Sequence, residues 1–267
     1  MTSLPSYADY GTYDESAHPD LWDGVVGYWA PCLGPTGLRL HDVSRGGNWG
    51  TLTNMTAADD WVIDAGQYAL DFDGTNDLVN AGTTGGAMLN GPPLSVAAWI
   101  NARSLGFGYQ GVISRDQNSP FAFSLRLAFG TPVLVTDGAN LFASSAISLN
   151  VWTHLMVSLG PSFRAIYING VLSASSTVAY TITSNTDNLY IGADFTGTSS
   201  DRLFNGLISD VIVWRRALTP NHIRQNYQLG RGGMLERRRR RRVYVEQAGF
   251  RAHYATQRAQ LIGGGLK

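Results

Sequence analysis

The chain has 267 residues, a length that one all-β sandwich with short tails accounts for. Its 31 Gly, 7 Trp, 12 Tyr and 10 Phe, against 15% charged residues, indicate a turn-rich, aromatic-rich globular protein and exclude a largely disordered or helical one. The net charge is zero but unevenly divided. Ten bases and two acids lie from Arg231 onward, leaving ten bases and 18 acids before it, so the last segment carries +8 and the rest −8.

The sequence also bears on the cellular compartment. Cys32 is the single cysteine, so no intrachain disulfide can form. The first residues, MTSLPSYADYGTYDES, contain neither the positive charge nor the apolar run of a secretory signal. No stretch reaches the roughly 20 apolar residues that span a bilayer. We therefore expect a protein without a signal peptide, made in a reducing cytoplasm and not inserted in a membrane.

Three regions follow one another along the chain. Residues 1–21 are predicted to form an N-terminal arm, residues 22–230 a sandwich and residues 231–267 a basic C-terminal arm. From position 25 to 214, short runs of alternating polarity are broken by Gly, Asn, Asp and Pro, which is typical of a β-sandwich. The clearest run predicts a half-buried strand with Arg126 on its outer face and an inner face made of Phe121, Phe123, Leu125, Leu127 and Phe129.

Local signals predict two hairpins and one helix. Asp137-Gly138 and Asn169-Gly170 each separate two apolar runs and favour the positive φ of tight turns. Thr219 is suited to cap a helix that Pro220 starts and Gly230 ends. We expect this short helix to seal one end of the sandwich.

A series of segments between Trp22 and Leu229 follows a recognisable order: GVVGYWAP, LHDVSRGGNWGTLTN, ALDFDGTNDLVNAG, LSVAAWIN, GVISR, VWTHLMVSLG, FRAIYINGV, NLYIGADF and FNGLISDVIVWRRALTPNHIRQNY. Together they resemble the laminin G-like domains of the concanavalin A-like class. The resemblance implies an all-β jelly-roll sandwich with one short capping helix. The run YQLGRGGMLERRRRRR and the stretch after it resemble, more loosely, tails of laminin G-like domains in virion proteins of tailed bacteriophages, which implies a structural role in a virion.

The residue types of the sandwich argue against catalysis. Retaining glucanases of the concanavalin A-like class need two carboxyl groups about 5 Å apart, usually glutamates. The glutamates of this chain are Glu15, Glu236 and Glu246, all outside the predicted sandwich. Neither a zinc-type histidine spacing nor a nucleophile elbow nor a nucleotide-binding loop occurs. We therefore predict that the protein is not an enzyme.

Three closely spaced aspartates are candidate ligands for a cation. Asp71, Asp73 and Asp77 lie in ALDFDGTNDLV, and Ca²⁺ prefers such clustered hard oxygen ligands. The alternative is that Asp73 and Asp77 cap the turn by accepting hydrogen bonds from its backbone. No other cofactor is predicted. Asp42 and Asp210 are interpreted as buried polar groups with satisfied hydrogen bonds.

Aromatic side chains are candidate contacts for sugar rings. Besides Trp22, they are Trp49, Trp61, Phe107 and Tyr109. Packing in the core is the alternative interpretation of each of them.

The basic arm is predicted to dock on an acidic partner. Its candidate contacts are Arg237, Arg238, Arg239, Arg240, Arg241, Arg242, Tyr244, Phe250 and Tyr254. Six adjacent like charges cannot all be buried, so a solvated linker is the alternative. Contact with nucleic acid is not expected, because no aromatic residue is interleaved with the arginines.

Two functions follow from these patterns. The leading hypothesis is a non-enzymatic virion protein, a capsid decoration or head-fibre subunit. Its arm would bind the major capsid protein or another virion protein, its sandwich would face outward, and we expect it to be a homo-oligomer. The alternative is a carbohydrate-binding adhesin or tail protein that recognises glycans on a host surface.

Overall fold

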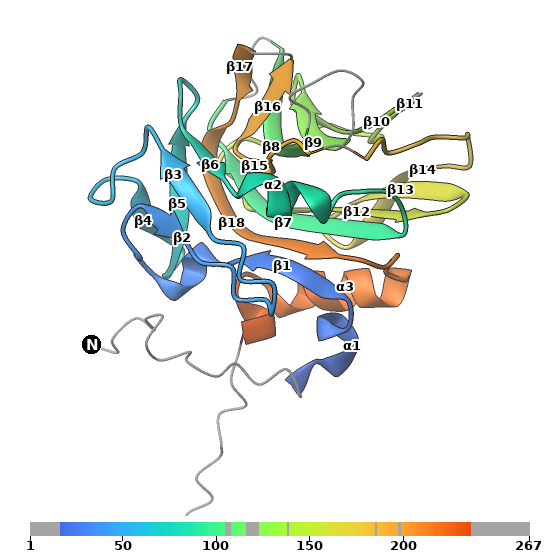
Figure 1. Ribbon diagram of the computed structural model, residues 1–267, viewed down its shortest axis with the longest axis horizontal. Coiled ribbons are helices and arrows are strands. Elements are labelled where there is room, and N and C mark those ends of the chain that lie inside the picture. The colour runs from blue at the N-terminus through green and yellow to red at the C-terminus, as the bar shows by residue number, and fades with distance from the viewer. Residues whose placement is uncertain are drawn as a thin grey trace, which may run out of the picture. The chain divides into compact units, whose positions relative to one another are not determined.

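Two antiparallel sheets stack face to face in the computed structural model (Figure 1), which describes residues 17–104, 108–115, 123–137, 139–184, 186–196 and 199–235. The predicted β-sandwich is therefore confirmed. Sheet A consists, in spatial order, of β14 (Val171–Ser176), β13 (Phe163–Ile168), β12 (Thr153–Gly160), β7 (Leu94–Ala102), β18 (Asn205–Trp214), β5 (Gln67–Asp73) and β4 (Trp61–Asp64), with β1 (Val25–Trp29) paired to β18. Sheet B consists of β11 (Ala139–Phe142), β10 (Thr131–Thr136), β9 (Phe123–Ala128), β8 (Tyr109–Arg115), β15 (Tyr190–Ile191), β6 (Leu78–Asn80), β3 (Gly50–Thr53) and β2 (Arg39–Leu40).

Short helices and a separate hairpin complete the described fold. The hairpin is formed by β16 (Ala193–Thr196) and β17 (Ser199–Leu203). The helices are α1 (Pro19–Trp22), α2 (Gly82–Ala87), α3 (Pro220–Leu229) and the 3-10 turns η3 (Pro31–Leu33) and η4 (Gly233–Leu235). Within the described residues, none of these helices has the length and apolar character needed to cross a membrane.

The main core fills the space between the sheets. On β7, Leu94, Val96, Ala98 and Ile100 all point into it, as the two-residue period of a strand requires. Ala97 joins instead a second apolar cluster on the outer face of sheet A, to which α1, η3, α3 and η4 contribute. The central strands of sheet A, such as β7 and β12, are therefore buried on both faces. Strand β9 is also buried along its whole length, so the expected half-buried strand is not found.

The predicted helix is confirmed, but its position is not. The Thr219 hydroxyl accepts a hydrogen bond from the His222 amide at 3.4 Å, and Gly230 ends α3 with φ of +74°. Instead of sealing an end, α3 lies against the outer face of sheet A, where Ile223 is fully buried and Tyr227 stacks on Trp99 at 5.8 Å. The apolar outer face of sheet A needs such a cover, because exposed apolar surface is unfavourable in water.

Three hairpins share a two-residue tip with positive φ at both positions: Ala65-Gly66 between β4 and β5 (48° and 80°), Phe129-Gly130 between β9 and β10 (49° and 81°), and Asn169-Gly170 between β13 and β14 (50° and 74°). The prediction for Asn169 is thus confirmed. Strands β10 and β11 also pair as predicted, although Gly138 between them lies outside the described residues. Phe129 was expected on the inner face of a strand and stands instead at a hairpin tip, because β9 ends at Ala128.

The sandwich continues past the boundary predicted at residue 230. The Arg231 guanidinium lies 3.9 Å from the ring centroid of Trp152, and Met234 and Leu235 are buried. At the other end, Leu21 is fully buried although it was assigned to the N-terminal arm. The chain divides into one unit up to Glu236 and a second unit, residues 237–267, which lies outside the described residues.

Asp210 holds the end of the sandwich unit in place. Its carboxylate accepts hydrogen bonds from the Gly232 amide at 2.8 Å, the Tyr28 hydroxyl at 3.1 Å, the Ser209 hydroxyl at 3.1 Å and the Cys32 thiol at 3.2 Å. Burial raises the pKa of Asp210 and also the pKa of the Cys32 thiol. The interpretation of Asp210 as a satisfied buried group is therefore confirmed, and Cys32 is a buried thiol that forms no disulfide.

Candidate functional site

The outer face of sheet B brings charged and aromatic side chains together. Leu125 and Leu127 of β9 enter the main core, so Arg126 between them points to the opposite face. Arg126 is paired with Val133 of β10, and Val133 with Phe142 of β11. This row of side chains lies on the face of sheet B that is turned away from sheet A.

The β16–β17 hairpin lies against β8 on this face (Figure 1). The Ser114 hydroxyl of β8 donates to the carbonyl oxygen of Ala193 at 2.8 Å. Gly111 of β8 permits the close approach, because a Cβ atom there would come within 3.0 Å of the backbone of Ala193 and Asp194. The approach carries Asp194 over sheet B, where its Oδ2 accepts a hydrogen bond from Arg126 at 2.8 Å.

Five side chains form what we call the Tyr109 cluster: Tyr109, Arg126, Phe129, Asp194 and Arg202. Asp194 Oδ2 is also 3.4 Å from a guanidinium nitrogen of Arg202. The guanidinium carbons of Arg126 and Arg202 lie 4.2 and 4.8 Å from the ring centroid of Tyr109, and the Phe129 ring lies 6.4 Å from it. Exposure rises through the cluster from Asp194 at 0% to Arg202 at 18%, Tyr109 at 38% and Phe129 at 65%. A buried charge pair thus supports an exposed aromatic pair.

The cluster contains more cationic than anionic groups. Two guanidiniums share one carboxylate, which leaves one positive charge in excess. Among the described residues, Asp194 Oδ1 and Arg126 Nε are buried without a hydrogen-bond partner. Each cation–π contact with Tyr109 adds about 0.5 to 2 kcal/mol. The arrangement holds Tyr109 and Arg202 in fixed positions at the surface.

The backbone of Phe129 is unfavourable for its residue type. A positive φ costs a residue with a Cβ about 1–2 kcal/mol, and Asn pays less of this cost than bulky residues do. Asn169 and Ala65 occupy the same position in the two equivalent hairpins. The hairpin therefore does not require phenylalanine, and such strain often marks a functional position.

Trp49 is a second exposed aromatic residue, 45% accessible and remote in sequence from the Tyr109 cluster. It stacks on His41 at 4.4 Å with 9° between the ring planes, and the Arg39 guanidinium lies 5.5 Å from its centroid. Burial and the charge of Arg39 lower the pKa of His41. Trp49 therefore has a partner on one ring face.

Asp42 organises the loop that carries Trp49. Its carboxylate accepts from the backbone amides of Tyr28 at 2.8 Å, Ser44 at 2.9 Å and Asn48 at 2.8 Å. The interpretation of Asp42 as a satisfied buried group is confirmed, since 4% of the residue is exposed.

The other predicted aromatic contacts are not available at the surface. Trp61 and Trp22 are each 7% exposed, and their indole nitrogens donate to the carbonyl oxygens of Gly37 at 2.9 Å and Met234 at 3.3 Å. The expectation that they stack on sugars is corrected, because their rings pack in the apolar clusters. Phe107 lies outside the described residues.

The three candidate calcium ligands are engaged by protein groups. Asp71 forms an ion pair with Arg103. Asp73 accepts from the amides of Thr75 at 2.7 Å and Asn76 at 3.2 Å, and Asp77 accepts from the Asp73 amide at 3.0 Å, which is the turn-capping alternative.

The pKa values of the two turn-capping aspartates shift in opposite directions. Burial alone would raise the pKa of Asp73, but the turn amides hold it below its usual value. Burial raises the pKa of Asp77 to about 6. In the described part of the chain, no group of three or more His, Cys, Asp or Glu side chains is placed to share a metal ion.

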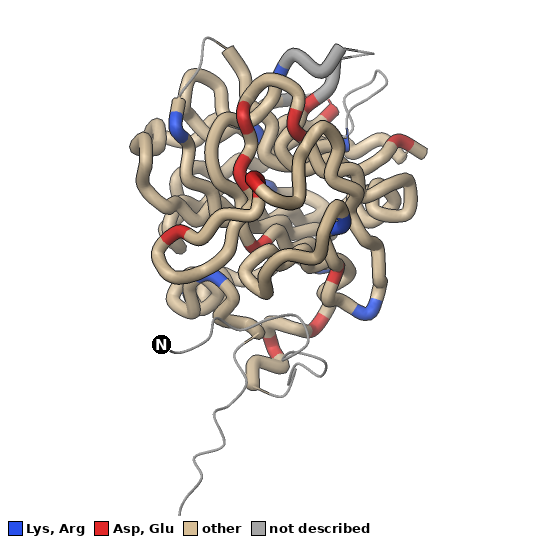
Figure 2. Tube along the Cα trace, turned by 90° about the vertical axis from the view of Figure 1, so that its left-hand side faces the viewer, with Lys and Arg blue, Asp and Glu red and all other residues tan. Residues whose placement is uncertain are grey.

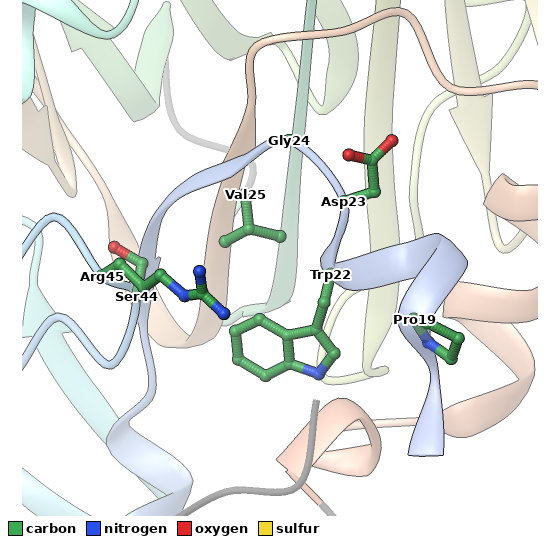
Figure 3. Close-up of a pocket in the computed structure, with 7 residues that line it drawn as sticks. All are labelled: Pro19, Trp22, Asp23, Gly24, Val25, Ser44 and Arg45. Carbon is green, nitrogen blue, oxygen red and sulfur yellow. The ribbon is translucent and has the colours of Figure 1, made fainter. Parts of the chain in front are cut away.

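A pocket of about 430 Å³ lies beside α1 and is lined by Pro19, Trp22, Asp23, Gly24, Val25, Ser44 and Arg45. Arg45 and Trp22 point toward one another in it (Figure 3). Arg216, which donates to the Asp23 carbonyl oxygen at 2.7 Å, closes the turn at its edge. The pocket has a suitable size for a small ligand, but its one aromatic ring is buried and offers no exposed face.

The predicted contacts of the basic arm, Arg237 to Arg242, Tyr244, Phe250 and Tyr254, lie outside the described residues. Of the Tyr109 cluster, the sequence identified Tyr109 as a contact and Arg126 as an outward-facing side chain. Asp194 and Arg202 carried no local signal, since 68 residues separate Asp194 from Arg126.

Comparisons with known proteins point to one superfamily. The family model described as the concanavalin A-like lectin/glucanases superfamily matches residues 72–224, more than half of the chain. No curated protein matches the chain.

Solved structures share the fold at low sequence identity. The sialidase of Trypanosoma rangeli in complex with the inhibitor DANA is 13% identical with a TM-score of 0.57, over 76% of this chain and 32% of the sialidase. Domain 4 of AbnA, an extracellular arabinanase of Geobacillus stearothermophilus, in complex with arabinotriose, is 17% identical with a TM-score of 0.53, over 75% of this chain and 97% of that domain. The binding domain of Paraclostridial Mosquitocidal Protein 1 is 15% identical with a TM-score of 0.56, over 78% and 52%. The chain thus spans about a third of the sialidase.

Proposed function

The chain belongs to the concanavalin A-like lectin/glucanase superfamily, and from that membership we propose that it is a carbohydrate-binding module whose Tyr109 cluster contacts the sugar. The observation that carries the proposal is Phe129, a strained and 65% exposed aromatic residue beside Tyr109 and two arginines. A sugar ring has an apolar face and polar substituents at its edge. An aromatic ring with polar groups beside it is complementary to both. The arabinanase domain that the chain matches over 97% of that domain's length is a structure with bound arabinotriose, which supports the proposal.

Binding without hydrolysis fits the carboxylates of the sandwich. The three glutamates lie at positions 15, 236 and 246, outside the described residues. Asp71 and Asp73, two closely spaced carboxylates of β5, are held by Arg103 and by turn amides. A carboxylate used in this way is not free to act as nucleophile or acid.

Replacement of Phe129 by glycine should weaken sugar binding without loss of stability. The change releases the strain of the positive φ, about 1–2 kcal/mol, and gives up only an exposed ring in a tilted contact with Tyr109. We expect the affinity for the best ligand of a glycan array to fall at least about tenfold, which corresponds to about 1.4 kcal/mol. Calorimetric titration measures the affinity, and thermal unfolding measures the stability.

Ala65→Gly is the matched control, because Ala65 has the same φ at the tip of another hairpin. It should leave sugar binding unchanged. Trp49→Ala tests the second exposed aromatic residue. Loss of binding in W49A together with full binding in F129G would place the contact at the Asp42 loop and contradict the proposal.

A structural role in a virion is the second candidate, favoured by the division of the chain at residue 236. The separate unit from Arg237 to Lys267 holds nine bases and one glutamate, so it carries a charge of +8. An acidic surface of a capsid protein is the kind of partner that such a segment attracts. In this proposal the sandwich binds host glycans while the arm attaches it to the particle.

The position of a truncation separates the arm from the sandwich. A chain ending at Glu236 should unfold at the same temperature as the full chain but no longer cosediment with virions. A chain ending at Gly230 should lose about 4 kcal/mol, because the buried Met234 and Leu235 and the amide that Gly232 donates to Asp210 are removed. Full cosedimentation of the chain that ends at Glu236 would exclude attachment through the arm.

A further inference from the structure

We infer that the Tyr109 cluster selects sugars that carry a carboxylate, such as uronic or sialic acids, over neutral sugars. The inference rests on the proposed function, since it names the class of sugar that the same site takes. It is carried by the charge and accessibility of the two arginines in the cluster.

Asp194 compensates one of the two guanidiniums and leaves the other in excess. A single oxygen, Oδ2, is near both cations, at 2.8 Å from Arg126 and 3.4 Å from Arg202. The shorter contact belongs to the pair whose side chains are 6% and 0% exposed. Arg126 is therefore the cation that Asp194 neutralises, and Arg202 is the one with residual charge.

Arg202 is also the accessible cation. Its side chain is 18% exposed, three times the value for Arg126. Within the described residues, its hydrogen bonding consists of the one contact to Asp194, which uses one of its five N–H donors. A planar guanidinium pairs with a carboxylate through two parallel hydrogen bonds, which a neutral hydroxyl cannot reproduce.

The position of Arg202 is fixed before a ligand arrives. Asp194 and the Tyr109 ring both contact its guanidinium, which removes part of the entropy cost of binding. Phe129 and Arg202 both lie within 6.4 Å of the Tyr109 ring centroid. A sugar ring on Phe129 can therefore direct a carboxylate substituent to Arg202.

The aspartates of β4, β5 and the loops beside them belong to another sheet than the cluster. Acidic residues lie on the side of the body that faces the viewer in Figure 2, which is the side of β4 and β5 in Figure 1, and the aspartates of these two strands and their loops are Asp59, Asp60, Asp64, Asp71, Asp73 and Asp77. These strands belong to the far end of sheet A, whereas the cluster is built on β8 and β9 of sheet B. Among the charged side chains that the described residues bring to the cluster itself, the cations are in excess, with two guanidiniums to one carboxylate.

The test uses ligand pairs that differ in the carboxylate. Trigalacturonic acid is compared with its methyl ester, and sialyllactose with its methyl ester, by calorimetric titration of the full chain. We expect at least one acid to bind about tenfold more tightly than its neutral partner. Arg202→Gln should remove this difference, so that this variant binds the acid and its neutral partner equally; the readout is the ratio of the two affinities measured on the same variant. The ligand pair in which the acid binds more tightly shows whether the site prefers a uronic acid or a sialic acid.

Arg39→Gln is the matched control, because Arg39 also lies over an exposed aromatic ring, that of Trp49, and carries the same charge. It should keep the preference for the acid. Equal binding of acid and neutral partner, still sensitive to F129G, would overturn the inference and leave the proposed function standing. An equal loss of preference in R39Q and R202Q would also overturn the inference, because the preference would then depend on the net charge of the protein and not on the position of Arg202. Absence of binding to any glycan would reject both.

Discussion

Replacement of Gly111 by alanine is expected to lower the free energy of unfolding by about 3 kcal/mol and to abolish sugar binding, although Gly111 has no side chain that contacts a ligand. The added Cβ would come closer than 3.0 Å to backbone atoms of Ala193 and Asp194. Backbone atoms cannot rotate aside, so β16 has to move away from β8. Asp194 then leaves Arg126, and a buried guanidinium without its carboxylate is strongly destabilising.

A glycine-to-alanine change within an ordinary strand has the opposite effect on stability. There it usually raises the free energy of unfolding by about 0.5–1 kcal/mol, because alanine loses less backbone entropy on folding. A net loss therefore measures the close approach of β16. Urea unfolding followed by tryptophan fluorescence gives the stability, and titration with the glycan that the wild type binds gives the affinity.

Gly85→Ala is the matched control for Gly111. A Cβ at Gly85 would lie 3.1 Å from the Ala81 methyl group and would meet side chains rather than backbone. Its effect should stay below about 1 kcal/mol, with binding intact. A G111A variant as stable as G85A would show that β16 does not lie against β8 as described.

The second large effect is a pH dependence of stability that belongs to His154. The ring is fully buried beneath α3, with Nε2 at 2.8 Å from the Asn226 side-chain oxygen. Burial lowers its pKa from 6.5 to about 4. Between these values the unfolded chain binds a proton that the folded chain does not, so stability rises with pH and acid costs about 1.4 kcal/mol per pH unit.

Asp77 acts in the opposite direction over nearly the same range. Its folded pKa of about 6 lies above the usual 3.8, so the folded state binds more protons there and its contribution to stability falls as pH rises. The two slopes oppose one another in the wild type. Comparison of variants, and not the wild-type curve alone, therefore reveals the contribution of His154.

We expect the stability difference between wild type and His154→Gln to shrink by about 3 kcal/mol in total as pH falls from 6.5 to 4. Asp77→Asn should instead make the protein more sensitive to acid than the wild type. Urea unfolding at half-unit pH steps measures both. A difference between wild type and H154Q that stays constant with pH would mean that His154 does not remain neutral in the fold.

Features set by a few neighbouring residues were predictable from the sequence. Asn169-Gly170 forms its hairpin and Thr219 caps α3, because φ preferences and side-chain caps act over two or three positions. The end of β9 could not be predicted from the alternating pattern, because Phe129 continues it. The tight turn that Phe129 forms with Gly130 reverses the chain there and exposes the phenyl ring.

The exposure of aromatic residues depended on the tertiary structure. Trp61 and Tyr109 are similar by residue type, yet one is 7% and the other 38% exposed. An aromatic side chain on a strand is buried only where another element covers that face of the strand. The covering element is usually distant in sequence, so the local sequence does not indicate it. The second cluster on sheet A buries Trp22 in this way.

The sequence by itself therefore determined the all-β class, the hairpin tip at Asn169-Gly170, the capped helix and the charge division between sandwich and arm, since composition and local dihedral preferences specify them. Only the tertiary structure decided that Arg126, Asp194 and Arg202 meet around Tyr109. Their meeting requires β16 to cross β8 at a residue without a side chain. Contacts of this kind form when whole sheets and hairpins stack, and no short stretch of sequence encodes them.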